Sequence, residues 1–268
     1  MSARTASGFE ERTIDELAIE DERSFRLVPL YAALKETLRR DGYRFRIMPR
    51  SRIVRWDRAL FLNLTFWGVE GGGDVLVSKR IAADVVTHVA WHHLAKRHLE
   101  PHAKQQAPCA ASLFLGEAIA SAFDLYLVGR LLNVAPQSSF LETQVPAMAE
   151  AAHATGLSER GFQKLLVDIA RDPQRAFEDL RQLLCDATAA LVACTAPEDA
   201  LTTLSAFDTH RFAPLLHRYE LSNWILFTRA YARPARTADP GDRMVRTVDR
   251  AMRKQSAPLD WLAASWLT

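Results

Sequence analysis

The chain has 268 residues, of which 49% are hydrophobic, so it can bury a large core as one big domain or two modest ones. Its 34 basic and 32 acidic residues give a formal net charge of +2. No overall field therefore marks it as a nucleic-acid or membrane binder. No stretch reaches the roughly 18 uncharged apolar residues of a membrane span, because Glu117 and Asp124 interrupt the best candidate.

Cysteine usage and the N-terminus indicate where the protein resides. Cys109, Cys185 and Cys194 form no CxxC pair, and an odd number of cysteines does not suit a disulfide framework. Residues 1–22 lack the apolar core of a signal peptide and are acidic where a transit peptide would be basic. We therefore expect a cytoplasmic protein with no membrane association.

The spacing of apolar residues changes twice in the first part of the chain. Residues 1–22 are polar and are expected to form a flexible N-terminus, and helical spacing of apolar residues predicts a helix at 25–40. YRFRIMP (43–49) then alternates, ALFLNLTFWG (59–68) is rich in aromatic and branched residues, and DVLVS (74–78) follows three glycines. These segments predict a small antiparallel sheet.

After residue 78 the apolar spacing is helical to near the end of the chain. Predicted helices span 79–97, 110–132, 143–155, 158–171, 174–194, 197–206, 211–231 and 241–254. A small sheet before a multi-helix domain is an α+β class, predominantly α. We expect a flexible 1–22, a part at 23–135 that holds the sheet, and a helical region at 136–268 packed on it.

Two predicted helices carry polar stripes. Asp84, His88 and His92 follow one another at spacings of four, so they lie on nearly one helix face. Imidazoles one turn apart can bind a single metal ion. Histidines with this spacing also occur by chance and then usually form hydrogen bonds with their neighbours. The spacing alone allows a metal site or a buried polar network.

The next helix favours the metal. Glu117, Ser121 and Asp124 form one stripe on an otherwise mostly apolar helix. Burying a carboxylate there costs on the order of several kcal/mol unless a cation, a proton or hydrogen bonds compensate. A divalent ion between the two stripes would satisfy both helices. We therefore predict that His88, His92 and Glu117 are metal ligands.

The segments HVAWH (88–92) and GEAIASAFD (116–124) resemble the site of the gluzincin zinc metallopeptidases, the thermolysin-like class. The motif of that family is HExxH followed by a helix that bears a glutamate. The resemblance covers roughly residues 43–132. It implies zinc-ligand roles for both histidines and for Glu117.

The sequence departs from this motif at Val89, which stands where the family has its general-base glutamate and cannot accept a proton. A zinc hydrolase would need another base, for which Asp84, Asp124 and His93 are candidates. A degenerate peptidase-like protein is the other possibility within the resemblance. Together with Ser121, the two aspartates are also candidates for supporting the ligands or for binding a second ion.

Two histidines and one carboxylate with open positions are also the ligand set of mononuclear non-haem Fe(II) oxygenases, which need no base at that position. The sequence therefore favours an iron-dependent oxygenase or oxidase that acts on a small organic substrate. A zinc hydrolase is the alternative. His210, His217 and Tyr219 are placed to fold back over the metal helices and complete a pocket, although no spacing requires it.

Two further signals have ordinary explanations as well as functional ones. Residues 149–166 resemble a helix-turn-helix, with Gly156 in the turn and Ser158 as N-cap, but a simple helical corner uses the same residues. A DNA-binding or adaptor protein is therefore an alternative, and nucleic acid is not the expected partner. Arginines crowd between residues 39 and 58, which indicates either a solvated sheet face or an anionic substrate.

Overall fold

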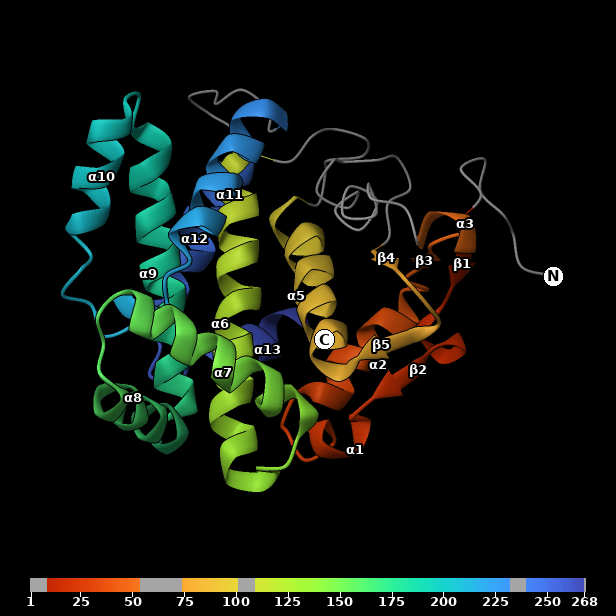
Figure 1. Ribbon diagram of the computed structural model, residues 1–268. Helices are drawn as coiled ribbons and strands as arrows, with labels where there is room; N and C mark the ends of the chain where they lie inside the picture. Colours follow the sequence, from red (N-terminus) through yellow and green to blue (C-terminus); the bar gives the residue numbers. More distant parts are fainter. Residues whose placement is uncertain (1–8, 54–73, 101–108, 232–239, 268) are drawn as a thin grey trace.

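The computed structural model describes residues 9–53, 74–100, 109–231 and 240–267 (Figure 1). Helices make up most of it, and short strands gather at one side (Figure 1). The predicted α+β class, predominantly α, is confirmed. The predicted strand at 59–68 lies outside the described residues.

The helices follow the apolar spacing of the sequence. They are α1 (Glu22–Phe25), α2 (Tyr31–Arg40), α3 (Arg50–Ile53), α5 (Ala83–Leu99), α6 (Ala110–Val134), α7 (Ser139–Ala154), α8 (Glu159–Arg171), α9 (Pro173–Ala193), α10 (Pro197–Ser205), α11 (Arg218–Tyr231), α12 (Pro240–Met252) and α13 (Pro258–Trp266), with the short 3-10 helices η1 (Ile14–Glu16) and η3 (Ala213–Leu215). Every helix predicted after residue 78 is present, although several boundaries move. Helix α13 was not predicted.

Two predicted helices are divided in the structure. The helix expected at 25–40 begins only at Tyr31, because Leu30 adopts a left-handed backbone with φ of 73° between α1 and α2. The helix expected at 211–231 is separated into η3 and α11, and Pro214 lies in η3. Proline has no N–H to donate to a preceding turn, so a longer helix does not form through it.

The strands form two small sheets. These strands are β1 (Glu10–Arg12), β2 (Ala18–Glu20), β3 (Phe45–Ile47), β4 (Val75–Leu76) and β5 (Arg80–Ala82). One sheet has the order β1-β3-β4, and the other pairs β2 with β5. The prediction of an antiparallel sheet is wrong for its described strands, because β3 and β4 pair in parallel. The β2–β5 pair is also parallel, whereas β1–β3 is antiparallel, with a first strand that was not predicted. Each parallel pair joins segments separated by long connections, which parallel pairing requires.

The prediction of a flexible N-terminus is wrong for residues 9–22. This segment supplies a strand to each sheet, and Phe9, Ile14 and Leu17 are buried. Strands of three residues are too short to show a clear alternation, so the pattern in the sequence is weak. Pairing with β3 and β5, which lie far along the chain, orders this segment.

Helix α6 forms the centre of the molecule (Figure 1). It contacts α5 on one side and α8 and α9 on others, and one buried apolar cluster runs from Ile14 to Trp266 through both predicted parts of the chain. By length and composition alone α6 is long and apolar enough to cross a membrane. In the structure, however, 78% of its most apolar window is buried among the other helices, as in a core helix.

Candidate metal centre

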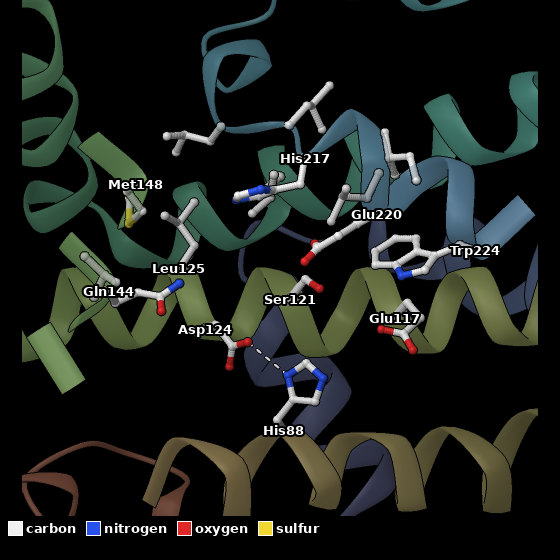
Figure 2. Close-up of a pocket in the computed structure, with 16 residues that line it drawn as sticks. His88, Glu117, Ser121, Asp124, Leu125, Gln144, Met148, His217, Glu220 and Trp224 are labelled. Carbon is white, nitrogen blue, oxygen red and sulfur yellow. Dashed lines mark hydrogen bonds and ion pairs between the residues drawn. The ribbon is translucent and has the colours of Figure 1, made fainter. Parts of the chain in front are cut away.

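Helices α5 and α6 approach closely beside the predicted ligands. Gly116 lies next to Glu117, and a Cβ atom at Gly116 would lie 3.3 Å from the Cβ of Ala95 on α5. The absent side chain therefore lets the two helices lie near enough for polar groups on one to meet those on the other. The polar stripe of α5 faces that of α6, as the sequence predicts (Figure 2).

The three predicted ligands come together. One ligand atom from each of His88, His92 and Glu117 can be chosen so that all three lie within 4.8 Å of one another. The Nε2 atoms of His88 and His92 are 3.1 Å apart, and Nε2 of His92 is 3.6 Å from Oε2 of Glu117. Ligand atoms about 2.0–2.1 Å from a tetrahedral Zn²⁺ lie roughly 3.3–3.4 Å apart. These two separations bracket that value and the third pair lies within 4.8 Å, so the three residues could hold a metal ion.

Asp124 orients one of these ligands. Its Oδ2 accepts a hydrogen bond of 2.9 Å from Nδ1 of His88, which leaves Nε2 of that ring directed toward His92. A carboxylate that holds the second nitrogen of a ligand histidine fixes its tautomer and orientation. Oδ1 of Asp124 is buried and has no hydrogen-bond partner among the described residues. Asp124 therefore supports the site from the side away from the ligand nitrogens.

The protonation of the site follows from burial and from its carboxylates. Burial alone lowers the pKa of His88, but the Asp124 carboxylate reverses this and raises that pKa to about 9. Burial and the neighbouring His88 charge lower the pKa of His92 to about 3. Burial and the charges of Asp124 and Asp74 raise the pKa of Glu117 to about 7. At neutral pH, protonated His88 donates to Asp124 and to the neutral ring of His92.

We expect the Asp124→Asn variant to lower the pKa of His88 well below the value of about 9 that it has in the wild type. An amide carries no charge to stabilise the imidazolium, whereas the burial that disfavours it remains. The measurement is an NMR titration of the histidine rings in the metal-free protein. His153, half exposed on α7, is the internal reference. A His88 pKa that stays near 9 would show that another group sets it.

Asp84 and His93, the other candidate bases on α5, lie at different places on this helix. Asp84 lies in the first turn of α5, and burial together with the Asp124 charge raises its pKa. His93 was a candidate base, but its Nε2 lies 2.7 Å from Oδ2 of Asp41, away from the ligands. Successive residues on a helix point about 100° apart, so His93 cannot share the face of His92. That candidate is therefore wrong.

No known protein family, curated protein or solved structure matches this chain. The resemblance to gluzincins thus stays a prediction that rests on residues 88–92 and 116–124. Val89, where that family has its base, is buried in the core and does not line the cavity described next.

A cavity of about 370 Å³ opens beside the ligands (Figure 2). His88, Glu117 and Asp124 form part of its wall, and residues from α7, α9 and α11 complete it. His217 lies across the cavity from Asp124, so the expectation that the segment before α11 folds back over the site is confirmed for this residue (Figure 2). His210 is not among the lining residues; its Nδ1 accepts from the backbone N–H of Phe212. The side chain of Tyr219 lies outside the described residues.

Three residues at the site were not predicted from the sequence. Glu220 and Trp224, one turn apart on α11, line the cavity. Asp74 precedes β4, and its charge acts on both ligand histidines and on Glu117. The Tyr43 hydroxyl donates to Oδ2 of Asp74 at 2.5 Å. The spacing of four on α11 shows only that Glu220 and Trp224 share a helix face, and a lone aspartate beside a short strand gives no signal at all.

Residues 149–166, which resemble a helix-turn-helix, form a helical corner between α7 and α8. Ser158 caps α8 by accepting from the backbone N–H of Gly161, as predicted, and Gly156 has a φ of 87° in the turn. One face of α8 is buried against the rest of the protein, and it carries Phe162, Leu165, Leu166 and Ile169. The corner therefore places the apolar face of α8 against the core. This packing is enough to explain the glycine, the serine and the apolar spacing of the segment.

Proposed function

We propose that this chain is a metal-dependent enzyme. Its single divalent ion is held by His88, His92 and Glu117, and its substrate is a small organic molecule in the adjoining cavity. One observation carries the proposal: three ligand atoms from two helices lie within 4.8 Å of one another at the wall of a cavity of about 370 Å³. Three protein ligands, fewer than the four of a structural zinc site, are typical of catalytic centres.

The arrangement of the chain supports a catalytic role for the ion. When bound, the ion would supply Lewis-acid or redox chemistry to a substrate in the cavity. His88 and Glu117 both line the cavity, so a substrate would reach the ligands from that side. Asp124 fixes the His88 ring, and Ser121 lies between Glu117 and Asp124 on the same wall as a hydroxyl that can orient a substrate.

An iron-dependent oxygenase or oxidase is the first candidate, because Val89 cannot serve as the base of a gluzincin-like hydrolase. A zinc hydrolase is the second candidate. It is favoured by His217, an exposed imidazole that lines the cavity opposite Asp124 and can accept a proton there. In either case the same three ligands hold the ion.

Elemental analysis of the full chain, purified without a histidine tag after growth with both iron and zinc, tests the proposal. About one equivalent of iron supports the oxygenase, and about one equivalent of zinc supports the hydrolase. Protein that carries neither metal, and takes up neither when they are added back, would contradict both candidates.

Metal affinity is expected to depend strongly on pH. A metal ion binds deprotonated ligands, so it must displace the proton from His88 below pH 9 and from Glu117 below pH 7. His92, with a pKa of about 3, has no proton to lose. Zinc affinity should thus rise about ten-fold per pH unit between pH 7 and 9, and more steeply below pH 7. Competition with a chromophoric chelator measures this slope; an affinity that does not change with pH would contradict the ligand assignment.

A further inference from the structure

Apart from the histidines, the charged residues that line the cavity are all acidic. Among its described lining residues the acidic ones are Glu117, Asp124 and Glu220, and none is a lysine or an arginine. A divalent ion at the proposed ligands would offset Glu117 and Asp124, which lie at the metal end. Glu220 comes from α11, on the other side of the cavity (Figure 2). Its charge is left for something else to balance.

Glu220 has no cationic partner among the described residues. Within the described part of the chain it forms no ion pair, although it is exposed at the cavity. The nearby arginines are engaged elsewhere, because Arg218 lies 2.8 Å from Asp208 and Arg211 lies 2.7 Å from Asp179. Figure 2 shows the Glu220 carboxylate directed into the cavity, toward Ser121.

Trp224 lies one helical turn after Glu220 and lines the same cavity (Figure 2). The face of an indole ring attracts an ammonium group through its quadrupole. A carboxylate and an indole at a spacing of four on one helix place both attractive groups on the same side. Together they form a site with the chemistry that recognises an organic cation.

We propose that the substrate is an amine with an apolar body. Its ammonium group meets Glu220 and Trp224, and its body lies against apolar residues of the cavity wall such as Met148, Leu180 and Leu184. This inference rests on the proposed function, since it names the substrate class of that enzyme. The cavity volume of about 370 Å³ lies at the lower end of the range for small-ligand sites, so the molecule is small.

The same features disfavour the anionic substrate that the arginines near residue 50 suggested. None of the described arginines between residues 39 and 53 lines the cavity. Arg39 pairs with Asp15 and Glu36 on the surface. An anion placed beside Glu220 would meet its negative charge with no lysine or arginine in the described lining to offset it, which costs binding free energy.

The test compares phenethylamine with phenethyl alcohol, which has nearly the same shape without the charge. Calorimetric titration of the zinc-loaded full chain at neutral pH should give an amine affinity at least ten-fold above that of the alcohol. In Glu220→Gln the amine should bind about ten-fold more weakly, whereas the alcohol should bind as it does to the wild type. Glu150→Gln, an exposed glutamate of α7 that does not line the cavity, is the matched control and should change neither affinity.

Several outcomes would overturn the inference. These are no detectable binding of the amine, equal binding of amine and alcohol, tighter binding of the alcohol, or an amine affinity that Glu220→Gln leaves unchanged. The zinc content of the same samples separates this failure from failure of the proposed function. If zinc is bound but the amine is not preferred, the metal centre is supported and the amine substrate class is wrong. If the amine is preferred but no metal binds, the metal-dependent enzyme is wrong and the cavity is an amine-binding site.

Discussion

Replacing His92 with alanine is expected to lower zinc affinity by more than a hundred-fold. The ring contributes the nitrogen between the other two ligands, 3.1 Å from Nε2 of His88 and 3.6 Å from Oε2 of Glu117. Loss of a residue that merely supports a ligand typically costs about ten- to a hundred-fold in metal affinity, so loss of a ligand should cost more. Competition with a chelator of known affinity measures the change.

His93→Ala is the matched control for this variant. It removes a histidine from the next position of the same helix, whose ring bonds Asp41 outside the site. Its zinc affinity should stay within a few-fold of the wild type. Equal losses in both variants would indicate that the fold of α5, and not the ligand set, had been disturbed. Unchanged affinity in His92→Ala would remove His92 from the site.

Glu117→Gln is expected to stabilise the metal-free protein at pH 8. The Glu117 side chain is only 12% exposed, and its pKa is raised from 4.5 to about 7 in the folded state. The ionised carboxylate therefore costs folding free energy. Each pKa unit corresponds to about 1.4 kcal/mol, so the variant should gain up to about 3 kcal/mol above pH 7.

The sign of this effect depends on pH in a defined way. Because the folded pKa lies above the unfolded one, the penalty is absent below pH 4.5, grows between pH 4.5 and 7, and stays constant above pH 7. Urea unfolding of both proteins at pH 5 and pH 8 should show a small difference at the lower pH and a large one at the higher. Glu150→Gln on α7 should show no such change. A Glu117→Gln variant less stable than the wild type at pH 8 would contradict the account.

Comparing the wild type with Glu117→Gln, with and without zinc, separates a metal-binding role of Glu117 from a structural one. The buried, ionised Glu117 carboxylate lowers the stability of the metal-free protein, and a bound cation restores that stability. Zinc should therefore stabilise the wild type but not Glu117→Gln. If Glu117 were retained only for packing, zinc would change the stability of the two proteins by the same amount.

Much of the site could be predicted because it lies within two helices. Spacings of four along α5, and of four and three along α6, decide which side chains share a face before any tertiary contact is known. His88, His92, Glu117 and Asp124 follow from that periodicity. Their meeting required only that α5 and α6 be neighbours, and the polar stripes on apolar helices indicated this.

The parts that were not predicted depend on contacts between distant segments. Strands β1 and β2 are three residues long and are ordered by β3 and β5, far along the chain. Glu220 and Trp224 are ordinary surface-helix residues until the turn at His217 sets α11 over α6. Asp74 likewise acquires its role from the position of β4. No local pattern encodes these placements.

The most direct measurement is an anomalous difference map from a crystal of the full chain grown with zinc, with data collected on either side of the zinc absorption edge. We predict one strong peak within bonding distance of Nε2 of His88, Nε2 of His92 and a carboxylate oxygen of Glu117, on the side that faces the cavity. A map with no peak there, or with zinc bound at other residues, would contradict it.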